Sequence, residues 1–303
     1  MPLYRAFELT IASDILLPEL ISLPENGNSI PDIHIVRSAI TFPSMEQTAI
    51  HRRGVMARSG TGSDGSICLQ WEGIASFRAV GGHTLYVDSY TEDFALLSLF
   101  TVSEALGCVL FQRGLLLLHA SSVQVGQEAF CFMGEPGAGK STTASAFVKQ
   151  GAQLLSDDLT AIAFDKKNQP FVLPAYPQLK IWGNTVQGLG LDSARLVPVS
   201  EGINKFAMVP DMDFPSKPVP VAQIYFLHKA RNRSALQAVQ PTEAPVELVR
   251  HFPLATHLLT GKALQRHFMQ SIWCASAASI WRLRRPKDFA SLEEWVLSNA
   301  TKV

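Results

Sequence analysis

One eight-residue segment, 134–141, constrains this chain more than any other part of its sequence. It reads GEPGAGKS and fits the pattern G-x-x-x-x-G-K-[ST]. Glycines let successive backbone N–H groups turn inward around anionic oxygens, and a helix that begins at such a loop adds unpaired N–H groups. An apolar run, 129–133, precedes the segment, and helical composition follows it to Gln150. The segment therefore predicts a phosphate-binding loop between a strand and a helix, in preference to a chance glycine-rich turn.

The loop predicts ATP as the ligand, with GTP as the alternative, and Mg²⁺ as its companion ion. In loops of this pattern the lysine contacts the β- and γ-phosphates and the hydroxyl of the next residue binds the metal ion. We therefore expect Lys140 to contact phosphate and Ser141 to bind Mg²⁺. The expected nucleotide-binding residues are Gly134, Glu135, Pro136, Gly137, Ala138, Gly139, Lys140, Ser141 and Thr142.

Two adjacent carboxylates, Asp157 and Asp158, follow the strand predicted at 153–156. A carboxylate on a strand beside such a loop commonly holds the metal ion, and a second can accept the proton of an attacking hydroxyl. The alternative is that Asp157 and Asp158 form only a solvated acidic turn. The position of the pair after the phosphate-binding loop, a helix and a strand favours the functional interpretation. His119 lies on a strand predicted before the loop; a lone histidine there is more often structural than functional.

The composition allows a large core and argues against some partners. Hydrophobic residues make up 47% of the 303 residues, and 26 Lys and Arg balance 26 Asp and Glu. A nucleic-acid-binding protein is usually basic, so no nucleic-acid partner is expected. The four cysteines lack metal-site spacing and are expected to be buried apolar residues in a reducing compartment. No apolar segment follows the first residues as in a signal peptide, so a cytoplasmic location is expected.

The chain divides by pattern into residues 1–90, a small β-rich domain, and residues 91–303, an α/β catalytic domain. Alternating segments predict strands at 4–11, 32–36 and 66–71, with turns at 25–28, 59–62 and 81–82. A helix is expected from Thr91, whose hydroxyl would cap it, to Gly114. Glu104 and Arg113 interrupt this apolar region, which predicts a core helix and a buried strand, with no membrane partner.

Four further elements of the catalytic domain are predicted from their patterns. A strand is expected at 221–227 and another at 280–283, and helices are expected at about 262–278 and 291–299. Arg282, Arg284 and Arg285 form a basic strand end, predicted to be a solvated sheet edge.

The order of His119, the loop and the acidic pair resembles the C-terminal kinase domain of the HPr kinase/phosphorylase family, which is related to phosphoenolpyruvate carboxykinases. The resemblance is clearest over 115–165. It implies a P-loop core in which Lys140 and Ser141 contact nucleotide and metal. It further implies that Asp157 is the general base, that Asp158 is its partner near the metal ion, and that His119 lies close to the transferred phosphate.

Three features depart from that family. Thr142 stands where the family has a glutamate, residues 1–90 differ from its N-terminal domain, and the later loop motif that serves phosphorolysis is not found. These differences stand against HPr as the acceptor and against a reverse phosphorylase activity.

Four segments resemble a subgroup of HPr-kinase-like proteins found with ribosomally made peptides, including lasso peptide kinases: 73–78, 176–182, 221–227 and 280–284. This resemblance implies phosphorylation of a peptide hydroxyl, typically that of a C-terminal Ser. The β-rich domain would help to grip the peptide by adding a strand to a sheet edge. The alternatives are a small-molecule kinase and a nucleotide-binding regulator. A homo-oligomer is also possible, because HPr kinases form hexamers.

A second cation is expected beside Lys140, because phosphoryl transfer spreads negative charge over the γ-phosphate. Lys180 and Lys205 rank first because they are in turn-rich stretches where binding loops occur. The other candidates are Arg231, Arg233 and Arg266.

Overall fold

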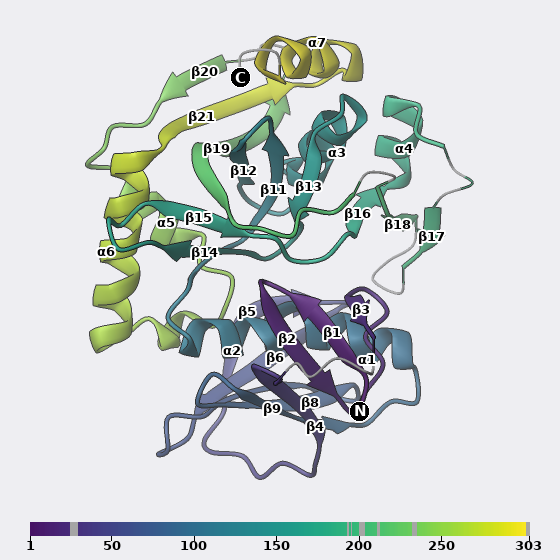
Figure 1. Cartoon of the computed structure of the whole chain (residues 1–303), viewed down its shortest axis with the longest axis vertical. Helices are drawn as coiled ribbons and strands as arrows, with labels where there is room; N and C mark the ends of the chain where they lie inside the picture. The colour runs from purple at the N-terminus through teal and green to yellow at the C-terminus, as the bar shows by residue number, and fades with distance from the viewer. Residues whose placement is uncertain are drawn as a thin grey trace. The chain divides into compact units, whose positions relative to one another are not determined.

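The computed structural model describes residues 1–24, 30–192, 194, 196–199, 204–210, 213–231 and 235–300. In these residues the chain has a mixed α/β fold with three sheets (Figure 1), so the predicted α/β class is confirmed at this level. The chain separates into two compact units. The first holds Met1–Leu117 and Phe252–Arg266, so it includes the helix that follows residue 90. Most of the remaining chain forms the second unit.

The strands of the first unit form one nine-stranded sheet over the described residues, in the order β3-β1-β2-β4-β9-β8-β7-β6-β5. The strands predicted at 32–36 and 66–71 are confirmed as β4 and β7. The bounds are β1 Leu3–Ala6, β2 Leu9–Ser13, β3 Ile21–Leu23, β4 Ile33–Arg37, β5 Glu46–Arg52, β6 Val55–Thr61, β7 Ile67–Trp71, β8 Ala75–Val80 and β9 Thr84–Ser89. The turn expected at 25–28 lies outside the described residues.

The single strand predicted at 4–11 is wrong, because this segment is a two-stranded hairpin. β1 and β2 pair antiparallel, and Phe7 and Glu8 form the turn between them. Both turn residues have left-handed backbone conformations, with φ of 54° and 60°. That geometry suits the right-handed twist of a hairpin, but it usually depends on Asn or Gly. The sequence has neither residue here and so gave no turn signal.

The helical segment of the first unit begins later than predicted. α1 (Phe94–Phe100) starts at the N-cap Asp93, whose carboxylate accepts a hydrogen bond from the Leu96 N–H at 2.9 Å. A π-helical turn (η1, Thr101–Ala105) joins α1 to α2 (Leu106–Gln112). The helical segment Phe94–Gln112 is long and apolar enough to cross a bilayer, but 78% of its most apolar stretch is buried inside the fold, as in a core helix. The predicted core helix is confirmed.

The second unit is built on a sheet with the described order β14-β15-β19-β12-β11-β13, in which β21 also pairs with β19 and β20 with β21. β12, β19 and β21 run parallel to one another, so their carboxyl ends meet at one edge. The bounds are β11 Ala120–Val125, β12 Glu128–Met133, β13 Gln153–Ser156, β14 Thr160–Phe164, β15 Pro170–Leu173, β19 Val219–Arg231, β20 Ala235–Ala238 and β21 Ser279–Pro286; β10 (Leu116–Leu118) precedes them.

The other elements described after β12 are a small separate sheet, five helices and one 3₁₀ turn. The 3₁₀ turn and the start of α6 belong to the first unit. The small sheet has the order β16-β18-β17, with bounds Leu179–Trp182, Lys205–Met208 and Leu196–Pro198. The predicted late helices are confirmed as α6 and α7, and the predicted late strands as parts of β19 and β21. The helices are α3 Lys140–Lys149, α4 Gly183–Leu189, α5 Ala244–Arg250, α6 Gly261–Ala277 and α7 Phe289–Ala300; a 3₁₀ turn covers Thr256–Leu258.

Aromatic side chains from the sheet and two helices form the core that supports the loop. Phe147 of α3 is fully buried, and its ring lies 5.3 Å from that of Phe132 and 5.8 Å from that of Trp295. Phe130 and Tyr225 extend the same cluster. The packing fixes α3 against the sheet and so positions the residue at which α3 begins.

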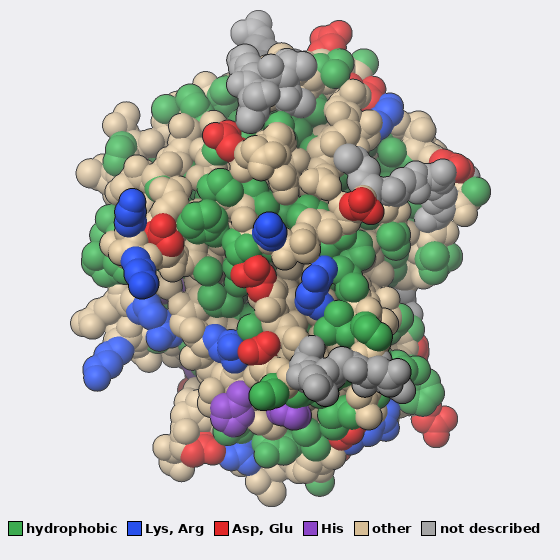
Figure 2. All heavy atoms as spheres, viewed as in Figure 1, with side chains coloured by type: hydrophobic (Ala, Val, Ile, Leu, Met, Phe, Trp, Pro, Cys, Tyr) green, Lys and Arg blue, Asp and Glu red, His purple; other side chains and the backbone are tan. Residues whose placement is uncertain are grey.

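All four cysteines are free and buried, as predicted. Burial raises the pKa of the Cys131 thiol to about 12, so this side chain acts as a small apolar group. On the face of the molecule in Figure 2, acidic and basic side chains both lie among apolar and uncharged ones, as the balanced composition suggests.

We expect Phe147→Ala to destabilise the second unit by about 3–5 kcal/mol, because it leaves a cavity among three aromatic rings. The matched control is Phe268→Ala on α6, where the side chain is 40% exposed. Urea unfolding of both variants measures the difference. Equal midpoints for the two variants would contradict the assigned core.

Candidate phosphate-transfer site

The predicted loop connects β12 to α3 at the edge where the parallel strands end. Its backbone requires glycine at two positions. Gly134 has φ of +144°, and a Cβ there would lie 2.5 Å from the Leu227 carbonyl oxygen. Gly139 has φ of +97°, and a Cβ there would lie 2.3 Å from Arg285 Nε. The glycines in the sequence pattern therefore serve close backbone packing as well as the turn.

Lys140 is the first residue of α3 and folds back over the loop. Its side chain is only 8% exposed, and its Nζ donates a hydrogen bond to the Gly134 carbonyl oxygen at 2.8 Å. Burial lowers the pKa of Lys140, and the neighbouring carboxylates of Asp158, Asp157 and Glu135 oppose that shift. The ammonium group therefore lies inside the loop, between its first residue and the acidic pair.

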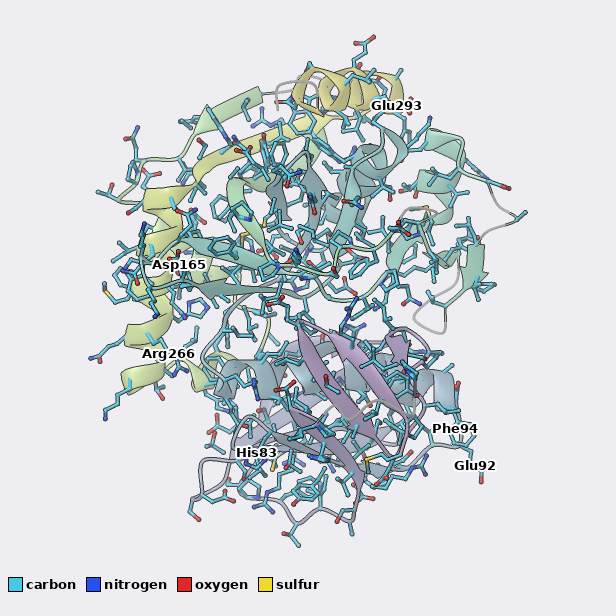
Figure 3. All side chains as sticks on the ribbon, viewed as in Figure 1. His83, Glu92, Phe94, Asp165, Arg266 and Glu293 are labelled. Carbon is cyan, nitrogen blue, oxygen red and sulfur yellow. The ribbon has the colours of Figure 1, made fainter. Side chains whose placement is uncertain are left out.

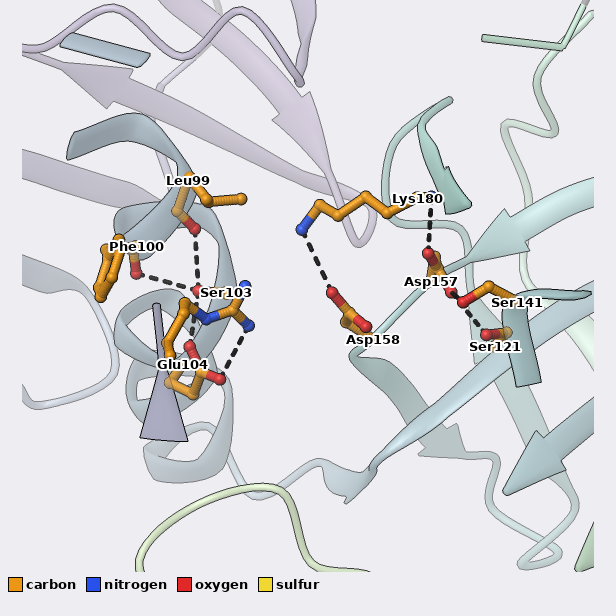
Figure 4. Close-up of polar contacts among 10 residues, drawn as sticks. Leu99, Phe100, Ser103, Glu104, Ser121, Ser141, Asp157, Asp158 and Lys180 are labelled. Carbon is orange, nitrogen blue, oxygen red and sulfur yellow. Dashed lines mark hydrogen bonds and ion pairs between the residues drawn. The ribbon is translucent and has the colours of Figure 1, made fainter. Parts of the chain in front are cut away.

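Asp157 follows β13, and its carboxylate accepts hydrogen bonds from three other elements (Figure 4). Oδ1 accepts hydrogen bonds from the Ser121 hydroxyl of β11 at 2.5 Å and from the Ser141 hydroxyl of α3 at 3.0 Å. Oδ2 accepts one from the backbone N–H of Lys180 on β16 at 2.9 Å. The side chain is 3% exposed. The loop serine and the first carboxylate are thus in direct contact.

Asp158 has a different environment although it is the next residue. Its φ is +64°, and the Leu159 N–H bonds to the Asp157 carbonyl across it at 2.8 Å, which makes a tight three-residue turn. Its side chain is 24% exposed, and Oδ2 lies 3.2 Å from Lys180 Nζ (Figure 4). Left-handed backbone at a residue other than glycine is uncommon and concentrates at functional sites.

Lys180 and Lys205 are on strands of the small sheet, not in irregular loops as the sequence suggested. Lys180 is on β16 with 2% exposure and is brought to the acidic pair. Lys205 is on β18 directly opposite Trp182, and its Nζ lies 5.7 Å from the centre of that ring. Its positive charge helps to lower the pKa of Lys140, so the two ammonium groups are near one another.

The other predicted cations are not shown at the site. Arg266, labelled in Figure 3, donates to the Phe111 carbonyl oxygen at 3.3 Å and lies over the Phe111 ring, a contact inside the first unit. Arg231 ends β19 and its side chain is not described. Arg233 lies outside the described residues. The contacts of the Arg266 guanidinium that the structure shows are therefore with Phe111, and they stabilise the first unit.

The remaining predicted residues lie around the loop. Glu135 and Pro136 are exposed at its tip, and Ala138 is buried. Thr142 is on α3 and its hydroxyl lies 2.9 Å from that of Thr185 on α4. His119 follows β10 in a bend, half-buried, and its backbone N–H donates to the His251 carbonyl oxygen at 3.0 Å.

Two residues at the site were not predicted to be there. Ser121 is one of the donors to Asp157. It is on β11, two residues after the bend at His119, and no local pattern in the sequence indicated its role. Arg285 was expected at a solvated edge, but its Nε donates to the Ala138 carbonyl oxygen at 3.4 Å, and burial lowers its pKa. Arg284, the next residue, is exposed as predicted.

The residues present fit a nucleotide with Mg²⁺. The loop fits close approach of phosphate because its glycines leave the backbone bare, and a buried ammonium group lies within it. Ser141 with Asp157 offers a hydroxyl and a carboxylate, the oxygen donors that Mg²⁺ prefers. Over the described residues there is no cluster of three or more His, Cys, Asp or Glu side chains suited to a metal ion. Mg²⁺ usually needs only one or two carboxylates besides phosphate and water.

No protein-family model matches this chain, and no curated protein matches it either. Among solved structures it is similar to the structure of the Hpr(Ser) kinase/phosphatase from Coxiella burnetii. The identity is 14% and the TM-score 0.29, and the match covers 61% of this chain and 97% of that one. Values this low show neither a family nor an activity, so the function rests on the residues of the site.

Asp157 makes the stability of the protein depend on pH. Burial, and then the charge of Asp158, raises the pKa of Asp157 to about 6, above the unfolded value of about 4. The folded state therefore binds more protons between these values, and stability falls as the pH rises from about 4 to about 6. Asp157→Asn should remove this component, which is on the order of 2 kcal/mol.

The measurement is the free energy of unfolding against pH, without Mg²⁺, for the wild type and Asp157→Asn. Glu92→Gln is the control, because Glu92, labelled in Figure 3, is exposed. Parallel curves for the wild type and Asp157→Asn would show that Asp157 does not titrate in this window.

Proposed function

We propose that this chain is a kinase that transfers the γ-phosphate of ATP to a hydroxyl group of a ribosomally made peptide, a Ser at or near its C-terminus. The observation that carries the proposal is the contact between the loop and the acidic pair. Ser141 of the loop bonds to Asp157, and Asp158 beside it bonds to Lys180, close to the Lys140 ammonium. Phosphate binding, metal binding and a base are then available within one site.

The loop side would hold the nucleotide. Lys140 would neutralise charge that develops on the transferred group, and the loop N–H groups would bind phosphate oxygens. Ser141 and Asp157 would hold Mg²⁺, which when bound neutralises charge on the β- and γ-phosphates. Ser121 and the Lys180 N–H fix the Asp157 carboxylate in the orientation this requires.

The geometry favours Asp158 as the proton acceptor, although the family resemblance implies Asp157. Both oxygens of Asp157 already accept hydrogen bonds, and its side chain is buried. Asp158 is more exposed, and Lys180 holds its carboxylate in place. The hydroxyl proton would pass to Asp158 while the hydroxyl oxygen forms a bond to the γ-phosphorus. The bond between that phosphorus and the β–γ bridging oxygen breaks, and the electron pair leaves with ADP.

The peptide acceptor rests on two considerations. Four segments resemble lasso peptide kinases, and a flexible chain end can bring a hydroxyl within the roughly 3 Å over which a base acts. In the first unit β5 is at one end of the described strand order, and such an edge can pair with an extended peptide. Cytoplasmic location and a homo-oligomer stay predictions of the sequence.

Incubation of the protein with ATP, Mg²⁺ and the precursor peptide encoded beside its gene should add phosphate, read by mass spectrometry. Replacement of the terminal hydroxyl residue by Ala should prevent it. Lys140→Ala should reduce transfer about 100-fold or more, because a cation beside the transferred group is lost.

Lys149→Ala on the same helix is the matched control, because Lys149 pairs with Glu293 at the surface. Its transfer should equal that of the wild type. Transfer to a sugar or other small alcohol, with none to any such peptide, would instead identify a small-molecule kinase. Lys140→Ala activity within a few-fold of wild type would refute the site itself.

The two carboxylates should fail in different ways. Asp157→Asn should weaken Mg²⁺-dependent nucleotide binding, because Asp157 contacts the metal-binding hydroxyl. Asp158→Asn should leave that binding near normal and reduce turnover about 100-fold or more, because the proton acceptor is lost. Titration calorimetry with ADP and Mg²⁺, and acceptor-dependent ADP release, measure the two effects. The opposite pattern would assign the base to Asp157.

A further inference from the structure

A cavity of about 280 Å³ adjoins the first residues of the loop. Its lining residues belong to the second unit and come from the segment after β12, from within β19 and β21, and from α5 with the residue that follows it. Its polar lining is supplied by Glu135, His228, Glu247, Arg250, His251 and Arg282. This volume is near the lower end for small-molecule sites, so it can take the end of a peptide but no folded partner.

The cavity lies at the γ-phosphate end of the loop. Lysine in a loop of this pattern contacts the β- and γ-phosphates. Lys140 Nζ donates a hydrogen bond to the carbonyl oxygen of Gly134, which is one of the residues that line the cavity. The backbone N–H groups of such a loop bind the α- and β-phosphates, so we expect the nucleoside to extend away from the Lys140 ammonium. The cavity is therefore on the side from which an acceptor would approach.

One cation in the cavity is available to a ligand. Arg282 is engaged by two carboxylates, Glu243 at 3.0 Å and Glu247 at 3.3 Å, and these bonds raise its pKa. Arg250 is 68% exposed, and among the described residues its ion pair is a 3.5 Å contact with Glu247, which Arg282 already engages. Exposed pairs of this kind contribute little, so Arg250 can turn to an incoming anion at small cost.

The rest of the lining limits what that anion can be. His251 stacks on Phe226, with ring centres 5.6 Å apart, and forms a flat wall. Burial lowers the pKa of His251, so the ring is neutral and adds no positive charge. Glu135 and Glu247 line the cavity beside the two arginines, and Glu243 also pairs with Arg282, so the lining has no excess of positive charge. A single carboxylate suits such a site, whereas a doubly charged group such as a phosphate monoester would meet repulsion.

We propose that this cavity binds the free C-terminal carboxylate of the acceptor peptide through Arg250, and so selects a terminal Ser over an internal one. A guanidinium group matches a carboxylate in two-point geometry. With the carboxylate held there, the hydroxyl of the same residue would face Gly134, whose carbonyl oxygen accepts the hydrogen bond from Lys140 Nζ. The inference rests on the proposed function, because it names the feature by which that function chooses its substrate.

The test compares one acceptor peptide in two forms, with a free C-terminal carboxylate and with a C-terminal amide, using the full chain with ATP and Mg²⁺. We expect kcat/KM at least about tenfold higher for the free acid. Arg250→Gln should remove that difference by lowering kcat/KM for the acid alone, with KM for ATP unchanged. Arg284→Gln on β21 is the matched control, because Arg284 is exposed and does not line the cavity; it should keep the difference. Free L-serine, offered as a third acceptor, should be phosphorylated poorly.

The outcomes separate this inference from the proposed function. Equal kcat/KM for the acid and the amide, or an acid preference that survives in Arg250→Gln, overturns the inference and leaves the peptide kinase standing. Transfer to free L-serine as efficient as to the peptide acid assigns the cavity to a small hydroxy acid and overturns it too. Absence of transfer to either peptide form, with ATP turnover intact, overturns both proposals.

Discussion

The hydrogen bonds to the Asp157 carboxylate are the interaction on which the rest of the site depends. One side chain receives donors from β11, the start of α3 and β16, while its own residue follows β13. None of these segments is local to another in sequence, so the site forms only when the second unit's sheet, helix and small sheet are all in place. A buried carboxylate without those donors would be costly, since its water is lost. The folding of the unit and the geometry of the site are therefore coupled through one group.

A chain of buried, hydrogen-bonded hydroxyl groups joins the strands next to Ser121 and Asp157. The Ser122 hydroxyl lies 2.6 Å from that of Ser156, which lies 2.6 Å from that of Thr160. Thr160 in turn donates to the Ala120 carbonyl oxygen at 3.1 Å. Small side chains let the strand ends approach closely at this point, and every hydroxyl finds a partner, as buried polar groups require. These hydrogen bonds thus hold together the ends of β11 and β13, from which Ser121 and Asp157 reach the site.

The sequence predicted the features that depend on local pattern. The loop, the strand before it and α3 after it follow from glycine spacing and apolar runs, and the late helices follow from periodicity. Lys180 and Arg285 illustrate what local pattern misses: their partners Asp158 and Ala138 are 22 and 147 residues away. Lys180 also lies in a stretch whose turn residues concealed a short strand. The turn at Phe7 and Glu8 was not predicted for another reason: the hairpin imposes a left-handed backbone on residues that seldom adopt it by themselves.

The acidic pair shows how adjacent identical residues acquire different chemistry. Two neighbouring carboxylates repel, and the family resemblance implied Asp157 as the base and Asp158 as its partner near the metal ion, without showing how their surroundings differ. The tight turn at Asp158 sends the two side chains into separate surroundings: one is buried and held by three neutral donors, and the other reaches an ammonium group. Burial and the neighbouring charge raise the pKa of Asp157, so a bound cation beside it would relieve the strain of carrying charge there. Asp158 already has a cation beside it, because its Oδ2 lies 3.2 Å from Lys180 Nζ. The different surroundings on which the proposed roles rest, metal binding for Asp157 and proton acceptance for Asp158, thus follow from one left-handed residue in the backbone.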